Sequence, residues 1–224
     1  MRGAQIIYLV RHAQSANNAQ DESKRVCDPS ITAVGQRQAV HLAKRLADIA
    51  FETLLTSPFR RALQTTKAVQ LSTGHLPELL VDLHENGGCY EGWKPDNFEG
   101  RNGFHDEEIR REIGKINIVT PVGPLGWWKS QPRESVPQST TRAIKLENYL
   151  KTRLVEKNKS IVCISHADFI SSLLKQMFGQ KIQEQSEFHL LKNTGVTSVK
   201  WASNSWQLIE LNSVSHLVEN LVTQ

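Results

Sequence analysis

Four short polar clusters in the 224-residue chain hold side chains that are suited to phosphoryl chemistry. Each cluster follows a short apolar run, and together they comprise Arg11-His12, Ser57 with Arg60 and Arg61, Glu85, and Ser165-His166. The rigid guanidinium fork of arginine matches phosphate oxygens two at a time. An imidazole that is largely unprotonated at neutral pH has a nitrogen that can accept a phosphoryl group. These residue types predict phosphoryl transfer without a metal ion.

The place of each side chain suggests its role. His12 follows its apolar run closely, which holds its backbone rigid and favours it as the nucleophile. Arg11 and Arg61 are expected to clamp the phosphoryl oxygens, and His166 to supply a proton or positive charge to them. Glu85 can protonate the leaving alkoxide and later activate water, provided that burial or neighbouring acidity raises its pKa.

Each of these residues also has an ordinary structural interpretation when it is considered alone. A histidine after a strand is structural more often than catalytic, an arginine pair on a helix is usually a solvated face, and Glu85 could cap a turn. Their joint occurrence at the ends of successive predicted strands is what favours a catalytic site.

Alternating strand and helix patterns place these clusters at one edge of a predicted sheet. Buried strands are predicted over 5–10, 51–56, 79–83 and 160–165, and helices over 32–50, 57–74, 139–156 and 166–178. Further strands are predicted over 187–191, 196–201 and 206–211, with a hairpin turn at Asn204-Ser205. This order predicts an α/β fold, with a mainly parallel sheet flanked by helices on both faces. Ligands bind beyond the carboxyl ends of the strands in such sheets, so the four clusters are expected to converge there.

Residues 86–136 lack the regular pattern of the rest of the chain. This segment is rich in glycine, holds four of the eight prolines and three of the five tryptophans, and has a helical pattern only over 105–113. A long irregular segment inside a compact chain is typical of a functional lid or an inserted subdomain. We therefore expect one domain over 1–224, with a lid over about 86–136.

Composition and charge argue against several other classes of protein. Hydrophobic residues make up 39% and charged residues 22%, and the net charge of +4 comes without a basic tract longer than Arg60-Arg61 or Arg110-Arg111, so nucleic-acid binding is not expected. No signal sequence and no run of about 18 apolar residues occurs, so we expect a cytoplasmic protein without a membrane partner. Three scattered cysteines support neither a disulfide framework nor a zinc site, and the oligomeric state is left open.

Several motifs, in the same order along the chain, resemble those of the histidine phosphatase superfamily, branch one, also called phosphoglycerate mutase-like. Residues 9–18 are similar to the family's R-H-G-E-S-x-x-N run, and 30–39 to its L-T-x-x-G-x-x-Q-A run. Residues 56–65 resemble the family's T-S-x-x-x-R-A-x-x-T run. Residues 83–85 match the position of the family's acidic residue, and residues 164–166 match the position of its second histidine. The resemblance covers nearly the whole chain and implies a histidine phosphatase fold.

The resemblance also implies the site residues. It implies a phosphohistidine at His12, with Arg11, Arg61 and His166 holding the phosphoryl group and Glu85 acting as the proton donor. Neither a metal ion nor another cofactor is implied.

Two further substrate contacts are expected. Asn18 would reach the phosphate or the lid by its family position. Ala167 lies in the first turn of the helix that begins at His166, where free backbone N–H groups and the positive end of the helix dipole face an anion. By family position the second phosphate-binding arginine is Arg61, so Arg60 is expected to point elsewhere, toward solvent.

Three positions depart from the family's pattern. Ala13 stands where glycine is usual, which adds a methyl group where backbone freedom is normally allowed, and Gln14 replaces a common glutamate. Ala167-Asp168 replaces a pair of glycines, so an extra carboxylate lies near the predicted pocket. Asp168 could order a histidine, repel an anionic part of the substrate, or face solvent.

The expected activity is hydrolysis of a small phosphorylated metabolite by a phosphomonoesterase. Residues 86–93 lack the R-H-Y-G-x-L-Q-G run of cofactor-dependent mutases, which favours water over a bound sugar acid as the final phosphoryl acceptor. The alternatives are a mutase, a catalytically silent phosphate-binding module, and a metal hydrolase built from His12, His84, His166 and Asp168. The natural substrate is left open; Tyr90 and the tryptophans of 86–136 either contact an apolar or ring-bearing leaving group or pack the insertion.

Overall fold

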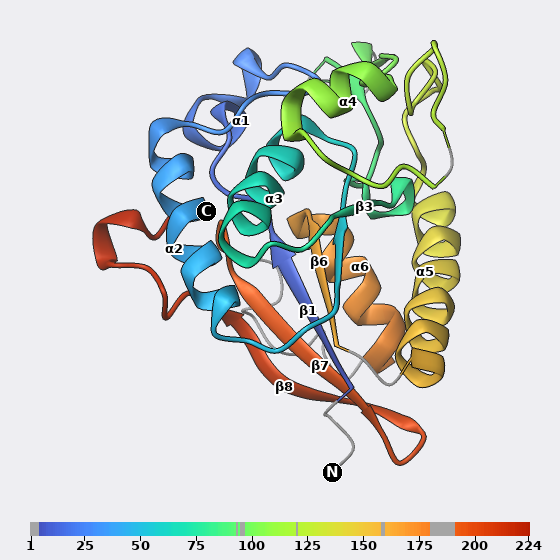
Figure 1. Cartoon of the computed structure of the whole chain (residues 1–224). Coiled ribbons are helices and arrows are strands. Elements are labelled where there is room, and N and C mark those ends of the chain that lie inside the picture. The colour runs from blue at the N-terminus through green and yellow to red at the C-terminus, as the bar shows by residue number, and fades with distance from the viewer. Residues whose placement is uncertain (1–4, 93, 95–96, 120, 158–159, 180–190) are drawn as a thin grey trace.

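The structure is a computed structural model of the chain, and it describes residues 5–92, 94, 97–119, 121–157, 160–179 and 191–224. Within these ranges, six strands form a sheet in the order β3-β2-β6-β1-β7-β8 (Figure 1). The strands are β1 (Ile6–Arg11), β2 (Thr53–Thr56), β3 (Glu78–Leu79), β6 (Ile161–Ser165), β7 (Val196–Ala202) and β8 (Ser205–Ser213). The pairs from β3 to β1 are parallel, whereas β7 and β8 add an antiparallel hairpin at one edge. The prediction of a mainly parallel sheet is confirmed.

Successive side chains of the central strands pack on opposite faces of this sheet, which is why helices cover both faces. One face is covered by α2 (Ala33–Ala47) and α3 (Arg60–Thr73), and the other by α5 (Val136–Lys157) and α6 (Ala167–Phe178). Val10 of β1 packs toward α2 and α3, whereas Ile7 and Leu9 pack toward α5 and α6. The short apolar strand runs of the sequence are explained by this burial on two sides.

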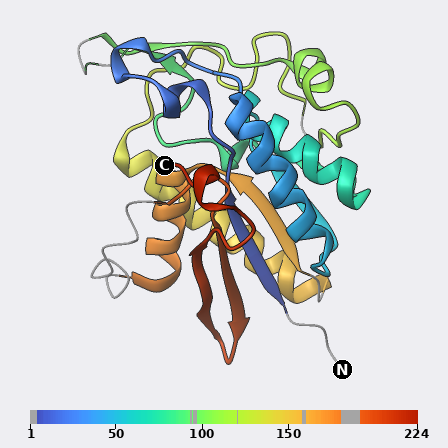
Figure 2. The same cartoon turned by 90° about the vertical axis from the view of Figure 1, so that its left-hand side faces the viewer.

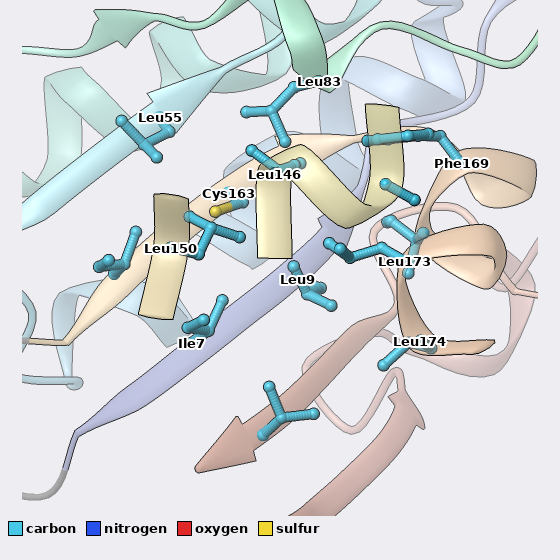
Figure 3. Close-up of a cluster of buried hydrophobic side chains, with 14 of the residues drawn as sticks. Ile7, Leu9, Leu55, Leu83, Leu146, Leu150, Cys163, Phe169, Leu173 and Leu174 are labelled. Carbon is cyan, nitrogen blue, oxygen red and sulfur yellow. The ribbon is translucent and has the colours of Figure 1, made fainter. Parts of the chain in front are cut away.

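The core under α5 and α6 supports the strands just below their carboxyl ends (Figure 3). Leu146 and Leu150 of α5 and Phe169 and Leu173 of α6 are almost fully buried there, in the same cluster as Leu9 of β1. Burying an aliphatic or aromatic side chain of this size stabilises a fold by about 1.5–3 kcal/mol. The strand ends that carry the chemical groups therefore rest on a tightly packed layer.

Helix α2 begins as the sequence predicts and lies directly against the chain that follows β1. Thr32 caps the helix, its hydroxyl accepting a hydrogen bond from Gly35 N at 3.0 Å. A Cβ atom at Gly35 would lie 2.2 Å from the backbone oxygen of Gln14, so this close approach requires glycine. The glycine near the start of the predicted helix is thus explained by packing, and the helix ends at Ala47 rather than near 50.

Three predicted boundaries are wrong. The helix predicted over 57–74 begins only at Arg60, because the backbone of its N-cap residue, Phe59, is extended and not helical. The strand predicted over 79–83 is β3 followed by a single 3-10 turn, η2 (Val81–Leu83), which forms because β2 ends at Thr56 and offers no partner beyond Leu80. The helix predicted over 139–156 begins earlier, at Val136.

The segment predicted to be irregular contains a small amount of regular structure. It holds the hairpin strands β4 (Tyr90–Glu91) and β5 (Glu99–Gly100) and the predicted helix, α4 (Asp106–Ile113). Trp127 and Trp128 are 4% and 8% exposed in a cluster that packs on Phe59 before α3, which favours packing of the insertion over substrate contact for these two. Trp93 lies outside the described residues. Movement of this segment as a lid stays a prediction, as does the one-domain organisation of 1–224.

The C-terminal hairpin extends away from the edge of the sheet that carries the chemical groups (Figure 2). Its turn is Ser203-Asn204, both residues having left-handed φ values of 51° and 59°, rather than the predicted Asn204-Ser205. The Trp201 and Trp206 rings lie edge to face there, with centroids 5.0 Å apart. Of the strand predicted over 187–191, residues 187–190 lie outside the described residues, and Leu191 is not in a strand. Short helical turns that were not predicted are α1 (Ala16–Ala19), η1 (Glu22–Lys24) and η6 (Glu219–Leu221).

Candidate active site

The carboxyl ends of three neighbouring strands bring the predicted chemical groups together. Arg11 at the end of β1 pairs in register with Ser165 at the end of β6, and His12 N donates to Ser165 O at 2.9 Å. Ser57 follows the end of β2 in the same way, and His166 follows β6. Both histidine side chains are buried, at 3% and 0% exposure. The predicted convergence of the clusters at one edge of the sheet is what the structure contains.

The His12 ring presents an unprotonated Nε2. Arg61 Nε, which can only donate, lies 3.1 Å from His12 Nε2, so that nitrogen is the acceptor. The ring proton is therefore on Nδ1, which lies 2.7 Å from the carbonyl oxygen of Ala13 and donates to it. Burial, and then the positive charges of Arg61 and Arg11, lower the pKa of His12 well below its usual value. A neutral imidazole with a fixed tautomer and an unprotonated Nε2 is the form that a nucleophile needs.

His166 lies beside His12 and is held by a serine. The two ring centroids are 5.1 Å apart, and His166 Nε2 lies 2.7 Å from Ser57 Oγ. Burial is the main cause that lowers the pKa of His166 well below its usual value, and Arg61 adds to it. Sequence reasoning placed Ser57 at this edge and gave it no role; its hydroxyl fixes the orientation of the second histidine.

Three buried nitrogen atoms at this edge have no hydrogen-bond partner within the part of the chain that the structure describes. They are Arg11 Nε, Arg61 Nη1 and His166 Nδ1. Buried polar atoms are nearly always paired in folded proteins, so three together suit a group with several acceptor oxygens. Burial lowers the pKa of Arg11 to about 10, which leaves its guanidinium charged at neutral pH, and Arg11 Nη1 donates to Leu191 O. We call Arg11, His12, Arg61 and His166 the cradle.

Asp28 is a partner of the cradle that sequence reasoning missed. Its Oδ1 lies 3.7 Å from Arg61 Nη1, and its carboxylate accepts the Arg60 N–H at the start of α3 at 2.9 and 3.1 Å. Burial raises the pKa of Asp28 to about 7, against the lowering effect of Arg61. The signal that could have found it is an Asp-Pro pair directly before the motif at 30–39.

Arg60 and Arg61 point to different places, although Arg60 forms an ion pair instead of pointing freely into solvent as predicted. Arg61 lies beside His12, whereas Arg60 Nε binds Glu112 of α4 at 3.0 Å with 41% of its side chain exposed. The first arginine therefore fastens the insertion to α3, and the second faces the cradle.

Glu85 lies on a turn after η2 rather than at a strand end. Its Oε1 accepts hydrogen bonds from Asn86 N at 2.8 Å and from Phe169 N, in the first turn of α6, at 3.0 Å. Burial and then the negative charge of Asp168 raise the pKa of Glu85 to about 7, while Arg61 opposes this. Asp168 itself is exposed, so of its three possible roles it takes the solvent-facing one while its charge acts on Glu85. A carboxyl group with this pKa can donate a proton near neutral pH.

The two further predicted contacts lie at the same edge of the sheet. Asn18 Oδ1 accepts from Ser15 N at 3.0 Å and lies 3.4 Å from Asn193 Nδ2, while the described part of the chain gives the Asn18 amide nitrogen no hydrogen-bond partner. Ala167 is the first residue of α6, where an anion would meet the helix N-terminus. Substrate contact by both residues stays a prediction.

The departures at positions 13 and 14 are accommodated by the structure. Ala13 is fully buried, does not have a left-handed φ, and donates its N–H to Thr65 Oγ1 at 3.0 Å, so its methyl group causes no backbone strain. Gln14 Oε1 accepts from the Thr32 hydroxyl at 2.6 Å, and its N–H donates to Gln38 Oε1 at 2.8 Å. Gln14 thus fastens the segment after His12 to helix α2.

The alternative of a metal site gains no support from the described residues. Across them, no group of three or more His, Cys, Asp or Glu side chains is arranged to hold a metal ion. His84 is 4% exposed and packs on Trp127 and Trp128, and its Nδ1 lies 2.9 Å from Glu85 O. Burial lowers the pKa of His84 to about 4.

Among the helices of the described ranges, none has the length and apolar character that crossing a membrane requires.

Comparisons with known proteins agree with this geometry. The sequence model of the histidine phosphatase superfamily (branch 1) matches residues 7–214. The uncharacterized phosphatase PhoE of Bacillus subtilis is 24% identical over 94% of this chain and 96% of its own length. The probable phosphoglycerate mutase GpmB of Erwinia tasmaniensis is 22% identical over 97% of each chain. A phosphoserine phosphatase mutant from Entamoeba histolytica, solved in complex with phosphoserine, has the same fold, with a TM-score of 0.62 at 22% identity over 95% of this chain and 99% of that chain.

Proposed function

Because the chain belongs to branch 1 of the histidine phosphatase superfamily, we propose that it is a metal-independent phosphomonoesterase that works through a phosphohistidine on His12. The observation that carries the proposal is the state of the His12 ring. Its Nε2 accepts from Arg61 and its proton is held on Nδ1 by Ala13 O, so Nε2 needs no proton transfer before it attacks, only release of the hydrogen bond from Arg61. The substrate is a small phosphorylated metabolite.

In the first step, His12 Nε2 forms a bond to phosphorus while the bond from phosphorus to the leaving oxygen breaks. The negative charge on the phosphoryl oxygens is met by the buried nitrogens of Arg11, Arg61 and His166. Glu85 gives its proton to the leaving alkoxide, which departs as an alcohol. The raised pKa of about 7 supports this role for Glu85.

In the second step, water replaces His12 at phosphorus. Glu85, now ionised, takes a proton from the water as its oxygen bonds to phosphorus and the nitrogen–phosphorus bond breaks. The products are inorganic phosphate and the free enzyme, with Glu85 protonated again. One carboxyl group thus serves both steps, and the hydrogen bonds from Asn86 N and Phe169 N keep it in place.

Relatives of this chain carry both phosphatase and mutase names, so the choice between them needs its own argument. Hydrolysis is favoured because residues 86–93 lack the run that cofactor-dependent mutases carry after the acid. A mutase must keep water out and return the phosphoryl group to a bound acid. A phosphatase needs only water at the same position.

The first test is release of inorganic phosphate from p-nitrophenyl phosphate in excess chelator. The second is rapid quenching in alkali, which preserves a phosphohistidine that acid would hydrolyse. We expect phosphate release that the chelator does not reduce, and a phosphorylated peptide that contains His12. His12→Ala should lose both signals. His75→Ala is the matched control, because His75 stacks on Phe51 with ring centroids 4.1 Å apart and is remote from the cradle.

Two outcomes would contradict the proposal. Turnover that survives in His12→Ala would exclude this nucleophile. Isomerisation of 3-phosphoglycerate with no phosphate release would replace hydrolysis by the mutase reaction.

A further inference from the structure

A buried ion pair lies behind the turn that carries Glu85. Arg142 of α5 and Glu134, just before α5, are each 8% exposed. Arg142 Nε donates to Glu134 Oε1 at 2.8 Å and Nη2 donates to Oε2 at 2.7 Å, which is the two-bond geometry that arginine and a carboxylate favour. Sequence reasoning gave neither residue a role.

The pair is hydrogen-bonded to the backbone on both sides of Glu85. Arg142 Nη1 donates to Asp82 O at 2.7 Å and to His84 O at 2.9 Å. On the other side, Glu134 Oε2 accepts from Gly87 N at 3.3 Å, and Glu134 N donates to Gly87 O at 3.0 Å. Four backbone contacts of one ion pair therefore fix residues 82–87, which we call the acid turn.

The same guanidinium also contacts the helix that holds the Glu85 carboxylate. The Arg142 Cζ atom lies 3.8 Å from the centroid of the Phe169 ring, and Phe169 N donates to Glu85 Oε1 at 3.0 Å. Arg142 is thus in contact with both elements that determine where the Glu85 oxygens lie. Lysine would carry the same charge, but it has neither the forked hydrogen-bond donors nor the flat surface that stacks on a ring.

We propose that Arg142 and Glu134 are positioning residues that hold Glu85 at the distance from which it can protonate the leaving group. This inference rests on the proposed function. A buried ion pair is often no more stabilising than a well-packed apolar pair, so a role in geometry accounts better for its presence beside the acid than a role in stability. Among the described residues, neither side chain hydrogen-bonds to the cradle, while burial and, to a lesser extent, the charge of Arg142 lower the pKa of His166. The hydrogen bonds of the pair therefore lead to Glu85.

The test compares Arg142→Lys with the unchanged enzyme on two substrates. An alkyl phosphomonoester needs a proton for its leaving alkoxide, whereas p-nitrophenolate departs without one. We expect kcat to fall by about 10²-fold for the alkyl ester, the size typical of general acid catalysis, with a much smaller loss for p-nitrophenyl phosphate. Glu134→Gln, which keeps the side-chain shape and removes the charge, should give the same pattern if Arg142→Lys folds poorly.

Two controls separate positioning from a general loss of structure. Arg153 also binds a carboxylate through two hydrogen bonds, from Nη1 and Nη2 to Glu78 at 2.8 and 3.1 Å, and it lies away from the acid turn, so Arg153→Lys should change neither substrate's kcat. In the double variant Glu85→Gln with Arg142→Lys, the alkyl ester should show no loss beyond that of Glu85→Gln alone, because both changes remove one function. Equal losses on both esters, or multiplying losses in the double variant, would overturn the proposal.

A readout without turnover keeps this test separate from the proposed function. The carbon-13 signal of the Glu85 carboxyl reports its titration in the free protein. In Arg142→Lys, we expect the midpoint to fall from about 7 toward the ordinary glutamate range, because a released side chain reaches more water. An unchanged midpoint would reject the positioning role even if the protein proved to have no phosphatase activity, and a shifted midpoint would support it in either case.

Discussion

The cradle and the acid turn are held in place by different means. His12 and His166 each directly follow a central strand, and the ladder of backbone hydrogen bonds extends to His12 through the bond from its N–H to Ser165 O. The acid turn overlaps the end of η2 and, within the described residues, pairs with no strand. It is held by the side chains of Arg142, Glu134 and Ser165, together with the backbone N–H groups of Phe169 and Glu134. The position of the nucleophile is a property of the sheet, and the position of the acid is a property of a few side chains.

Because of this difference, variants of the two regions should lose activity in different ways. Loss of a cradle group should weaken transfer from every ester, because all of them share the phosphoryl group. Loss at the acid turn should depend on how much the leaving group needs a proton. Four predictions test whether the two regions can be told apart in this way.

The largest effect is expected at Arg61. Arg61→Ala removes a buried cation that faces the phosphoryl oxygens, and kcat/KM should fall by about 10³-fold for alkyl and aryl esters alike. Steady-state phosphate release measures this, and Arg60→Ala is the matched control because Arg60 binds Glu112 instead. A similar loss in both variants would mean that the two arginines do not divide their roles as described.

The next largest effect is expected at Glu85. Glu85→Gln keeps the shape of the side chain and removes the transferable proton, so kcat should fall by about 10²-fold for an alkyl phosphomonoester. The loss for p-nitrophenyl phosphate should be much smaller in the same assay. If both substrates lost activity equally, the acid turn would behave like the cradle and the contrast would fail.

A pH profile should show the same contrast. Glu85 must be protonated to act as the acid, so kcat for the alkyl ester should decline above about pH 7, where the raised pKa of this carboxyl lies. The decline approaches about tenfold per pH unit, and it should be absent from the residual activity of Glu85→Gln. A descending limb that persists in this variant would assign the titration to another group.

The smallest effect is expected at Ser57. Ser57→Ala removes the hydroxyl at 2.7 Å from His166 Nε2, which should cost about 1 kcal/mol and reduce kcat roughly fivefold for both esters. Thr73→Val is a suitable control, because its hydroxyl donates to Val69 O at the other end of α3. A loss confined to the alkyl ester would link Ser57 to the acid rather than to the cradle.

The cradle could be predicted from the sequence because local patterns determine it. Short apolar runs identified β1, β2 and β6, and parallel strands must end at one edge, so His12, Ser57 and His166 had to converge. Glu85 was predicted at a strand end and lies instead on a turn, since the apolar pattern over 79–83 does not distinguish a buried strand from a buried 3-10 turn.

The supporting residues could not be predicted in the same way. Asp28 contacts α3 at a separation of 32 residues, and Arg142 contacts Asp82 at a separation of 60. Such contacts leave no periodic signal in the sequence, because they depend on how distant segments pack. The packing within 86–136 could not be predicted for the same reason, because its core is formed by residues that are scattered along the segment, such as Cys89 and Ile109.

The distribution of the indole rings has an optical consequence. Three tryptophans fall within 86–136, and the remaining pair, Trp201 and Trp206, lies in the hairpin that extends from the opposite side of the molecule. Replacing that pair by phenylalanine leaves all of the tryptophan fluorescence, which can be excited apart from that of tyrosine, in the insertion. The emission of such a protein on addition of phosphate would then report on the surroundings of the insertion alone, without an attached dye.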